Sequence, residues 1–123
     1  MVGAYAEVGF AATSSPHATW AVNPVTMTFP AGTIGIKLDS FTCSPSATGI
    51  TLTAKASTSR VSLSVAPGSF SSCGSSPDLV TLNAQCLVSA ALCRGSYQGL
   101  VQIRQPANYR NIPDNLMVNI VVT

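Results

Sequence analysis

The chain has 123 residues and a formal net charge of +2, and only 8% of its residues are charged, against about 25% in ordinary soluble domains. This length suits one domain with a single hydrophobic core. The six basic and four acidic side chains are scattered singly along the chain, so no basic stripe marks a nucleic-acid interface. No apolar run approaches the ~20 residues that a membrane-spanning helix needs.

Apolar and polar residues alternate through most of the chain, and this pattern predicts β-strands. The first alternating run covers residues 2–12, and a turn-like segment that contains His17 separates it from the rest. Seven further strands are predicted, at residues 24–29, 33–43, 50–56, 61–65, 78–84, 96–103 and 115–122. Residues 79–92 are the one helical candidate, and the strand interpretation is stronger there too.

Period-two alternation also predicts which side chains enter the core. In residues 33–43 it places Ile34, Ile36 and Leu38 inside, with Lys37 and Asp39 in solvent. In residues 50–56 the isoleucine, leucine and alanine point inward, and the threonines and Lys55 point outward. The predicted core consists of Ile36, Leu38, Leu52, Leu63, Val65, Leu82, Tyr97, Val101, Ile103, Val118 and Ile120.

Short strands separated by turns rich in Pro, Gly and Ser predict an all-β protein. We expect an immunoglobulin-like antiparallel β-sandwich of about seven strands, formed by residues 21–123, plus an extra N-terminal strand within residues 1–20. Tyr97, at the start of the penultimate strand, is expected to bond through its hydroxyl to the backbone of the preceding connection, as in a tyrosine corner.

The segment from Ile50 to the C-terminus resembles bacterial immunoglobulin-like modules of the BACON type. Three pieces carry the resemblance: LSVAPG at residues 63–68, GSYQGLVQI at 95–103, and NIP at 111–113 leading into the last alternating run. The chain departs from that pattern at Val61-Ser62, where an aromatic residue is common, and by the cysteines around residues 86–93. The resemblance implies the sandwich fold and a role as a binding or spacer module on a cell surface.

The four cysteines are an even number without zinc-site spacing, which favours disulfides over free thiols. Three connectivities are possible. We prefer Cys86–Cys93, because the loop between them suits a local bridge, together with Cys43–Cys73. Disulfides favour an extracellular or cell-surface location. No signal-peptide pattern follows Met1, so we expect a mature form or export by another route.

No residue pattern indicates catalysis, so we expect no enzyme activity, cofactor or metal. His17 is the only histidine and has no spacing that suggests a catalytic triad. The four acids form no pair for acid–base work and no cluster for Ca²⁺. An isopeptide bond between Lys37 or Lys55 and Asn119, assisted by Glu7, is disfavoured because the alternation places both lysines and the asparagine on polar faces.

The N-terminal run can pair within its own sandwich, or it can add to the open sheet edge of another copy. Head-to-tail addition of this kind does not close and builds a filament. We expect an extracellular structural subunit that self-assembles by strand addition, with Val2, Tyr5, Val8 and Phe10 at the interface. The alternatives are a monomeric binding or spacer module and a viral capsid or decoration protein on a virion surface. Carbohydrate is a weaker candidate partner, through the aromatic residues Tyr5, Trp20 and Tyr109.

Overall fold

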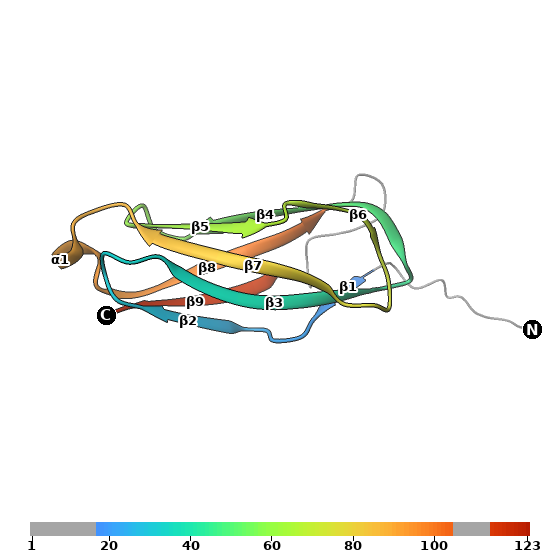
Figure 1. Cartoon of the computed structure of the whole chain (residues 1–123), viewed down its shortest axis with the longest axis horizontal. Coiled ribbons are helices and arrows are strands. Elements are labelled where there is room, and N and C mark those ends of the chain that lie inside the picture. The colour runs from blue at the N-terminus through green and yellow to red at the C-terminus, as the bar shows by residue number, and fades with distance from the viewer. Residues whose placement is uncertain (1–16, 105–113) are drawn as a thin grey trace, which may run out of the picture.

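The computed structural model describes residues 17–104 and 114–123, which form two β-sheets packed face to face (Figure 1). The elements are β1 (His17–Trp20), β2 (Val25–Phe29), β3 (Gly35–Ser44), β4 (Ala47–Ala56), β5 (Val61–Ala66), β6 (Ser69–Cys73), β7 (Asp78–Cys86), α1 (Ala90–Cys93), β8 (Gly95–Arg104) and β9 (Leu116–Val122). The prediction of an all-β sandwich is confirmed, and each strand predicted after residue 20 is present. β1 and β6 were not predicted, and the expectation that His17 lies in a turn is wrong.

One sheet has four strands in the order β1-β3-β7-β5, and the other has five in the order β2-β9-β8-β4-β6. All pairings are antiparallel except β2 with β9, which is parallel. The parallel pair arises because the first part of the chain serves both sheets. β1 pairs with β3, the chain crosses over at the cis peptide Asn23–Pro24, and β2 then runs beside the last strand of the opposite sheet.

The core lies between the sheets and is built from alternating side chains of both. The predicted core residues Leu52, Leu63, Leu82, Val101, Ile103, Val118 and Ile120 are buried, and Val65 and Tyr97 are partly buried against them. An aromatic cluster that was not predicted fills the end near β1. The Trp20 and Phe41 rings lie 5.1 Å apart, and Phe70 meets Phe41 edge-on at 5.3 Å.

The predicted orientation of β3 is wrong. Ile36 and Leu38 are 63% and 65% exposed, whereas Asp39 is buried. In a regular strand one set of alternate residues faces the core, and in β3 the residues from Phe41 onward decide which set it is. Phe41 belongs to the aromatic cluster, and Cys43 forms a disulfide with the opposite sheet, so the odd-numbered residues must face the core.

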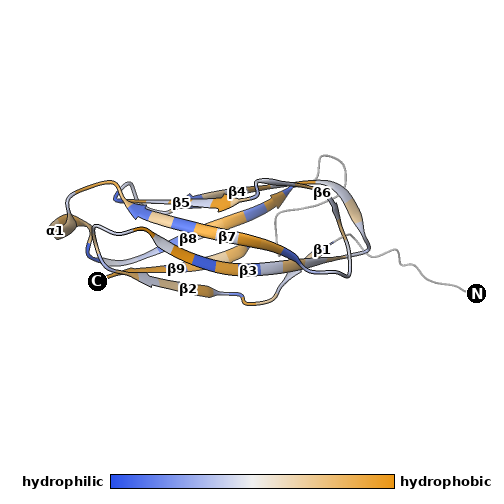
Figure 2. Ribbon diagram, in the orientation of Figure 1, coloured by the Kyte–Doolittle hydropathy of each residue, from blue (hydrophilic) through white to orange (hydrophobic). Residues whose placement is uncertain are grey.

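Gly35 and Phe29 support the same phase. A Cβ atom built on Gly35 would overlap the Phe29 ring, so this ring packs directly on the glycine backbone. With position 35 facing inward, its even-numbered neighbours must face solvent. Figure 2 shows that apolar and hydrophilic residues alternate in blocks along β3 and β7.

Both disulfides are present in the preferred pairing. Cys43–Cys73 joins β3 to β6, so it links the two sheets. Cys86–Cys93 joins the end of β7 to α1. The Tyr97 hydroxyl donates a hydrogen bond to the Cys93 carbonyl oxygen at 2.8 Å, as the tyrosine corner predicted.

The sandwich is elongated, with β1 near one end and α1 and the C-terminus at the other (Figure 1). Among the described residues no helix is long and apolar enough to cross a membrane. The predicted division at residue 20 stays a prediction, because residues 1–16 lie outside the described part of the chain.

Candidate functional site: an open edge of strand β3

The first half of β3 forms an open edge of the four-stranded sheet. β1 pairs only with Phe41–Ser44, and the last contact on that side is the hydrogen bond from the Ala21 N–H to the Ser40 carbonyl oxygen at 2.9 Å. The chain then leaves for the other sheet. Within residues 17–104 and 114–123, β7 is therefore the only strand that pairs with residues 35–39.

The polar backbone groups of Ile36 and Leu38 point toward the open side. In a strand the N–H and C=O of alternate residues face opposite neighbours. The Cys43 N–H donates to Gly74 on the β7 side, whereas the Ser40 carbonyl accepts from Ala21 on the β1 side. The even-numbered residues thus present their donors and acceptors to the missing neighbour, and such a row is a template for an added strand.

The side chains at this edge are apolar and exposed. Ile34, Ile36 and Leu38 are exposed on the outer face, and Leu79 of β7 extends the patch. We call these four residues the outer apolar stripe. The outward positions around the stripe on β3, β5 and β7 carry Ser, Thr, Ala, Asn or Gln and no charged residue. Natural proteins usually protect an exposed edge with charges, a proline or a bulge. Lys37 is the one charged side chain exposed at residues 34–39, and the stripe beside it makes this edge a candidate interface.

Two polar residues of β3 lie on the opposite side from the stripe. Asp39 is buried, and its Oδ1 accepts from the N–H groups of Val22 at 3.1 Å and Ser40 at 2.8 Å, where the chain leaves the sheet. Its Oδ2 has no hydrogen-bond partner among the described residues. Lys37 shares the inward phase of Asp39 but is exposed.

β1 is anchored by two hydrogen bonds to Asp114. The Trp20 Nε1 donates to the Asp114 backbone oxygen at 2.7 Å, and the Asp114 carboxyl accepts from the Ala18 N–H. Burial of that carboxyl raises its pKa above the usual value of 3.8, although the Ala18 hydrogen bond and the nearby His17 oppose this rise. The first described residue, His17, therefore lies beside Ser44, at the end of β3 that is remote from the open edge.

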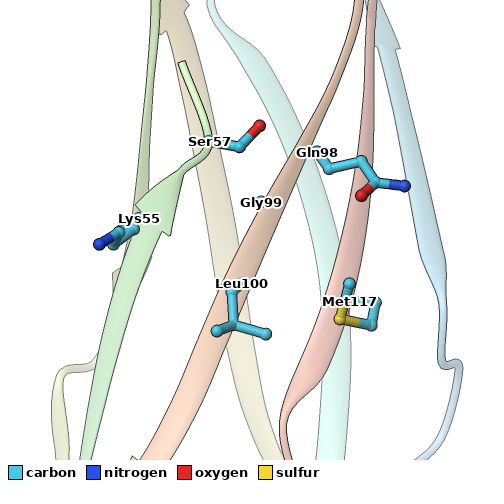
Figure 3. Close-up of a pocket in the computed structure, with 6 residues that line it drawn as sticks. All are labelled: Lys55, Ser57, Gln98, Gly99, Leu100 and Met117. Atoms are coloured by element: carbon cyan, nitrogen blue, oxygen red, sulfur yellow. The ribbon is translucent and has the colours of Figure 1, made fainter. Parts of the chain in front are cut away.

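A second candidate surface lies on the outer face of the five-stranded sheet. It is a shallow hollow of about 230 Å³. Figure 3 shows the residues that line it: Lys55, Ser57, Gln98, Gly99, Leu100 and Met117. The Leu100 and Met117 side chains provide apolar surface on two paired strands. A further hollow of about 300 Å³ shares Lys55 and Leu100 and extends toward Thr53 and Gln102.

No three His, Cys, Asp or Glu side chains come close enough to bind a metal in residues 17–104 and 114–123. Trp20 is buried and so cannot stack on a sugar. Lys55 lies on the outer face of its sheet, and the Asn119 side chain contacts Thr26.

The predicted interface residues Val2, Tyr5, Val8 and Phe10 lie outside the described residues, as do Glu7 and Tyr109. The prediction that they form an interface therefore stays a prediction. The open edge was not predicted, because the predicted phase of the strand at 33–43 placed Ile34, Ile36 and Leu38 in the core. Phe41 and Cys43, which have the opposite phase to Ile34 and Ile36, were the signal in the sequence that could have located the edge.

The described residues form a two-sheet β-sandwich. No family model matches the chain, and no curated protein matches it. Among solved structures, the crystal structure of domains 4 and 5 of the S-layer protein SbsC is similar, with a TM-score of 0.54 and 10% sequence identity. The match covers 96% of this chain and 55% of that one, so the chain spans about half the length of the structure it resembles. At this identity the likeness shows the β-fold alone, and it does not support the BACON type in particular.

Proposed function

We propose that this protein is a non-enzymatic structural subunit of an extracellular surface assembly, joined to copies of itself by β-strand addition. The observation that carries the proposal is the open, apolar edge of β3. An edge of this kind in a monomer would be a site of uncontrolled aggregation, whereas in an assembly it is an interface. Residues 2–12 supply the added strand in this proposal.

Composition and disulfides support the location and the role. A surface with few charges favours association, and two disulfides suit an oxidising environment outside the cell. The similar solved structure comes from an S-layer protein, which is consistent with a structural role at a surface.

Strand addition offers both affinity and specificity. Backbone hydrogen bonds would give much of the affinity, and side-chain pockets would give the specificity. Burial of the Phe10 side chain would contribute about 1.5–3 kcal/mol by the transfer of apolar area from water. A head-to-tail contact of this kind does not close on itself, so it produces a filament or layer rather than a discrete ring.

Size-exclusion chromatography and negative-stain microscopy of the full chain test this proposal. We expect large assemblies, and we expect the double substitution Val8→Asp and Phe10→Asp to leave folded, unassembled protein. Thr13→Asp with Ser14→Asp adds the same charge outside the run and is the matched control, which should assemble normally. A full chain that stays monomeric at high concentration, or a Val8/Phe10 variant that assembles like the control, would contradict the proposal.

The hollow near Leu100 and Met117 favours a second candidate function, a monomeric binding module. Its volume of about 230 Å³ lies below the ~300–1,000 Å³ typical of sites for drug-sized ligands. The hollow therefore suits a side chain or a small apolar group. A full chain that remained monomeric, together with ligand binding that Met117→Ala weakens, would favour this function over assembly.

A further inference from the structure

We propose that the open edge of β3, at residues 34–39, is the acceptor for residues 5–10 of a second copy, which add antiparallel to β3. This inference rests on the proposed function and specifies which surfaces meet. It also predicts a register, and the register can be tested one residue pair at a time.

The free backbone groups favour β3 as the acceptor. Ile36 and Leu38 present their N–H and C=O groups to the open side, and an added strand would satisfy both residues. Ala21 already bonds to Ser40, so the available stretch ends at Asp39. The open stretch is thus short, and it matches part of the N-terminal run rather than a long strand.

The direction of β1 favours a second copy as the donor. β1 is antiparallel to β3 and begins beside Ser44, so the preceding residues start at the end of β3 that is remote from Ile34. A neighbour stacked end to end would approach the open edge at Ile34, and its N-terminal run would extend from there toward Asp39. The run would then be antiparallel to β3 and in line with the acceptor's own β1. For the same copy to supply the run, its chain would have to reverse direction within residues 13–16 and pass its own β1. The run would then lie parallel to β3.

Charge complementarity sets the register. Residues 2–12 contain one charged residue, Glu7, and the exposed part of the open edge contains one, Lys37. Cross-strand pairs of opposite charge stabilise a sheet, and placing these two opposite each other defines all the other pairs. Val8 then lies opposite Ile36, and Phe10 lies opposite Ile34.

This register matches the two faces of the edge as well. Val8 and Phe10 share the outer face with the apolar stripe, which would cover exposed aliphatic surface. Glu7 and Tyr5 share the other face with Lys37 and Asp39. Tyr5 brings a hydroxyl donor to the side of the strand on which the Asp39 Oδ2 has no hydrogen-bond partner among the described residues.

Disulfide trapping between copies tests the contact directly. Lys37 is an odd-numbered residue, so it would form a non-hydrogen-bonded pair with Glu7, with Cα atoms about 4.5 Å apart and within disulfide range. We expect full chains carrying Glu7→Cys to form covalent dimers with full chains carrying Lys37→Cys under mild oxidation. Lys55→Cys is the matched control, because it replaces an exposed lysine on β4, which belongs to the opposite sheet.

A charge exchange tests the register without a covalent bond. Lys37→Glu and Glu7→Lys should each raise the concentration needed for assembly by roughly threefold to tenfold, because each places like charges opposite one another. The chain with both substitutions should assemble like the wild type, and Lys55→Glu should leave assembly unchanged. No rescue in the double variant would overturn this register.

The outcomes separate this inference from the proposed function. If the wild type assembles and the Val8/Phe10 variant does not, but Lys37→Cys traps Glu7→Cys no better than Lys55→Cys does, the function stands and β3 is not the acceptor. If one chain carrying both cysteines forms only an internal bond, the strand adds within its own copy and the inference is wrong. If the wild type stays monomeric, both proposals are wrong.

Discussion

Replacing Leu38 or Leu82 by alanine tests the phase of β3, on which the open edge depends. Leu38 is 65% exposed and Leu82 is fully buried, although both lie in regular strands of the same sheet. Full burial of a leucine side chain is worth about 1.5–3 kcal/mol, so the buried third of Leu38 accounts for roughly 0.5–1 kcal/mol. Leu82→Ala also leaves a cavity and should cost about 2–5 kcal/mol.

Urea unfolding, followed at one low protein concentration, measures both losses. The free energy of unfolding follows from the midpoint and the slope, and equal slopes confirm that the variants unfold from comparable states. We expect Leu82→Ala to lose at least twice as much stability as Leu38→Ala. Equal losses, or a larger loss at Leu38, would refute the phase and with it the exposed apolar stripe.

Two further predictions concern the disulfides and a buried acid. Replacing both cysteines of Cys43–Cys73 by alanine should lower the free energy of unfolding by about 3.6 kcal/mol, and the same change at Cys86–Cys93 by about 2.4 kcal/mol. The first loss is larger because a loop of 30 residues restricts the entropy of the unfolded chain more than a loop of 7 does. Equal losses in urea unfolding would contradict this account. Because the pKa of Asp114 is raised, the folded state holds the carboxyl proton more tightly than the unfolded state does. The stability that the protonated carboxyl contributes is therefore complete below pH 3.8 and is lost as pH rises through the folded pKa. The stability of the wild type relative to Asp114→Asn should therefore fall as pH rises above 3.8, and a flat or rising difference would show that burial does not control this carboxyl.

The open edge connects the composition of the chain to its proposed role. Edge strands of soluble monomers are usually protected by charges, prolines or bulges. Here Lys37 is the one charged side chain exposed along residues 34–38 of the described chain, and the stripe beside it is aliphatic. An assembled subunit can tolerate such an edge because a partner covers it, and the same reasoning explains how a chain with only 8% charged residues can be functional.

Local patterns in the sequence were sufficient for the fold class and for much of the core. Alternation predicted every strand from β2 onward except β6, since a half-buried strand has a side-chain period of two whatever its neighbours are. In β4, Ile50 and Leu52 are buried and alternate with Thr51, Thr53 and Lys55, which are exposed. The Cys86–Cys93 disulfide and the Tyr97 hydrogen bond were also predicted, because both are local contacts. Cys43–Cys73 was then the pair that remained.

Only the tertiary structure decided which face of β3 is buried and which strand edge is open. Within β3, Ile36 and Leu38 favour one phase, whereas Phe41 and Cys43 favour the other. Partners distant in sequence decide between them: Trp20 and Phe70 around Phe41, and Cys73 on the opposite sheet. Local hydrophobicity cannot weigh these contacts, because the free energy of burial depends on what lies across the core rather than on the strand alone. The open edge has the same cause, since it exists only because β1 ends at Trp20 and the chain crosses to the other sheet beside Ser40.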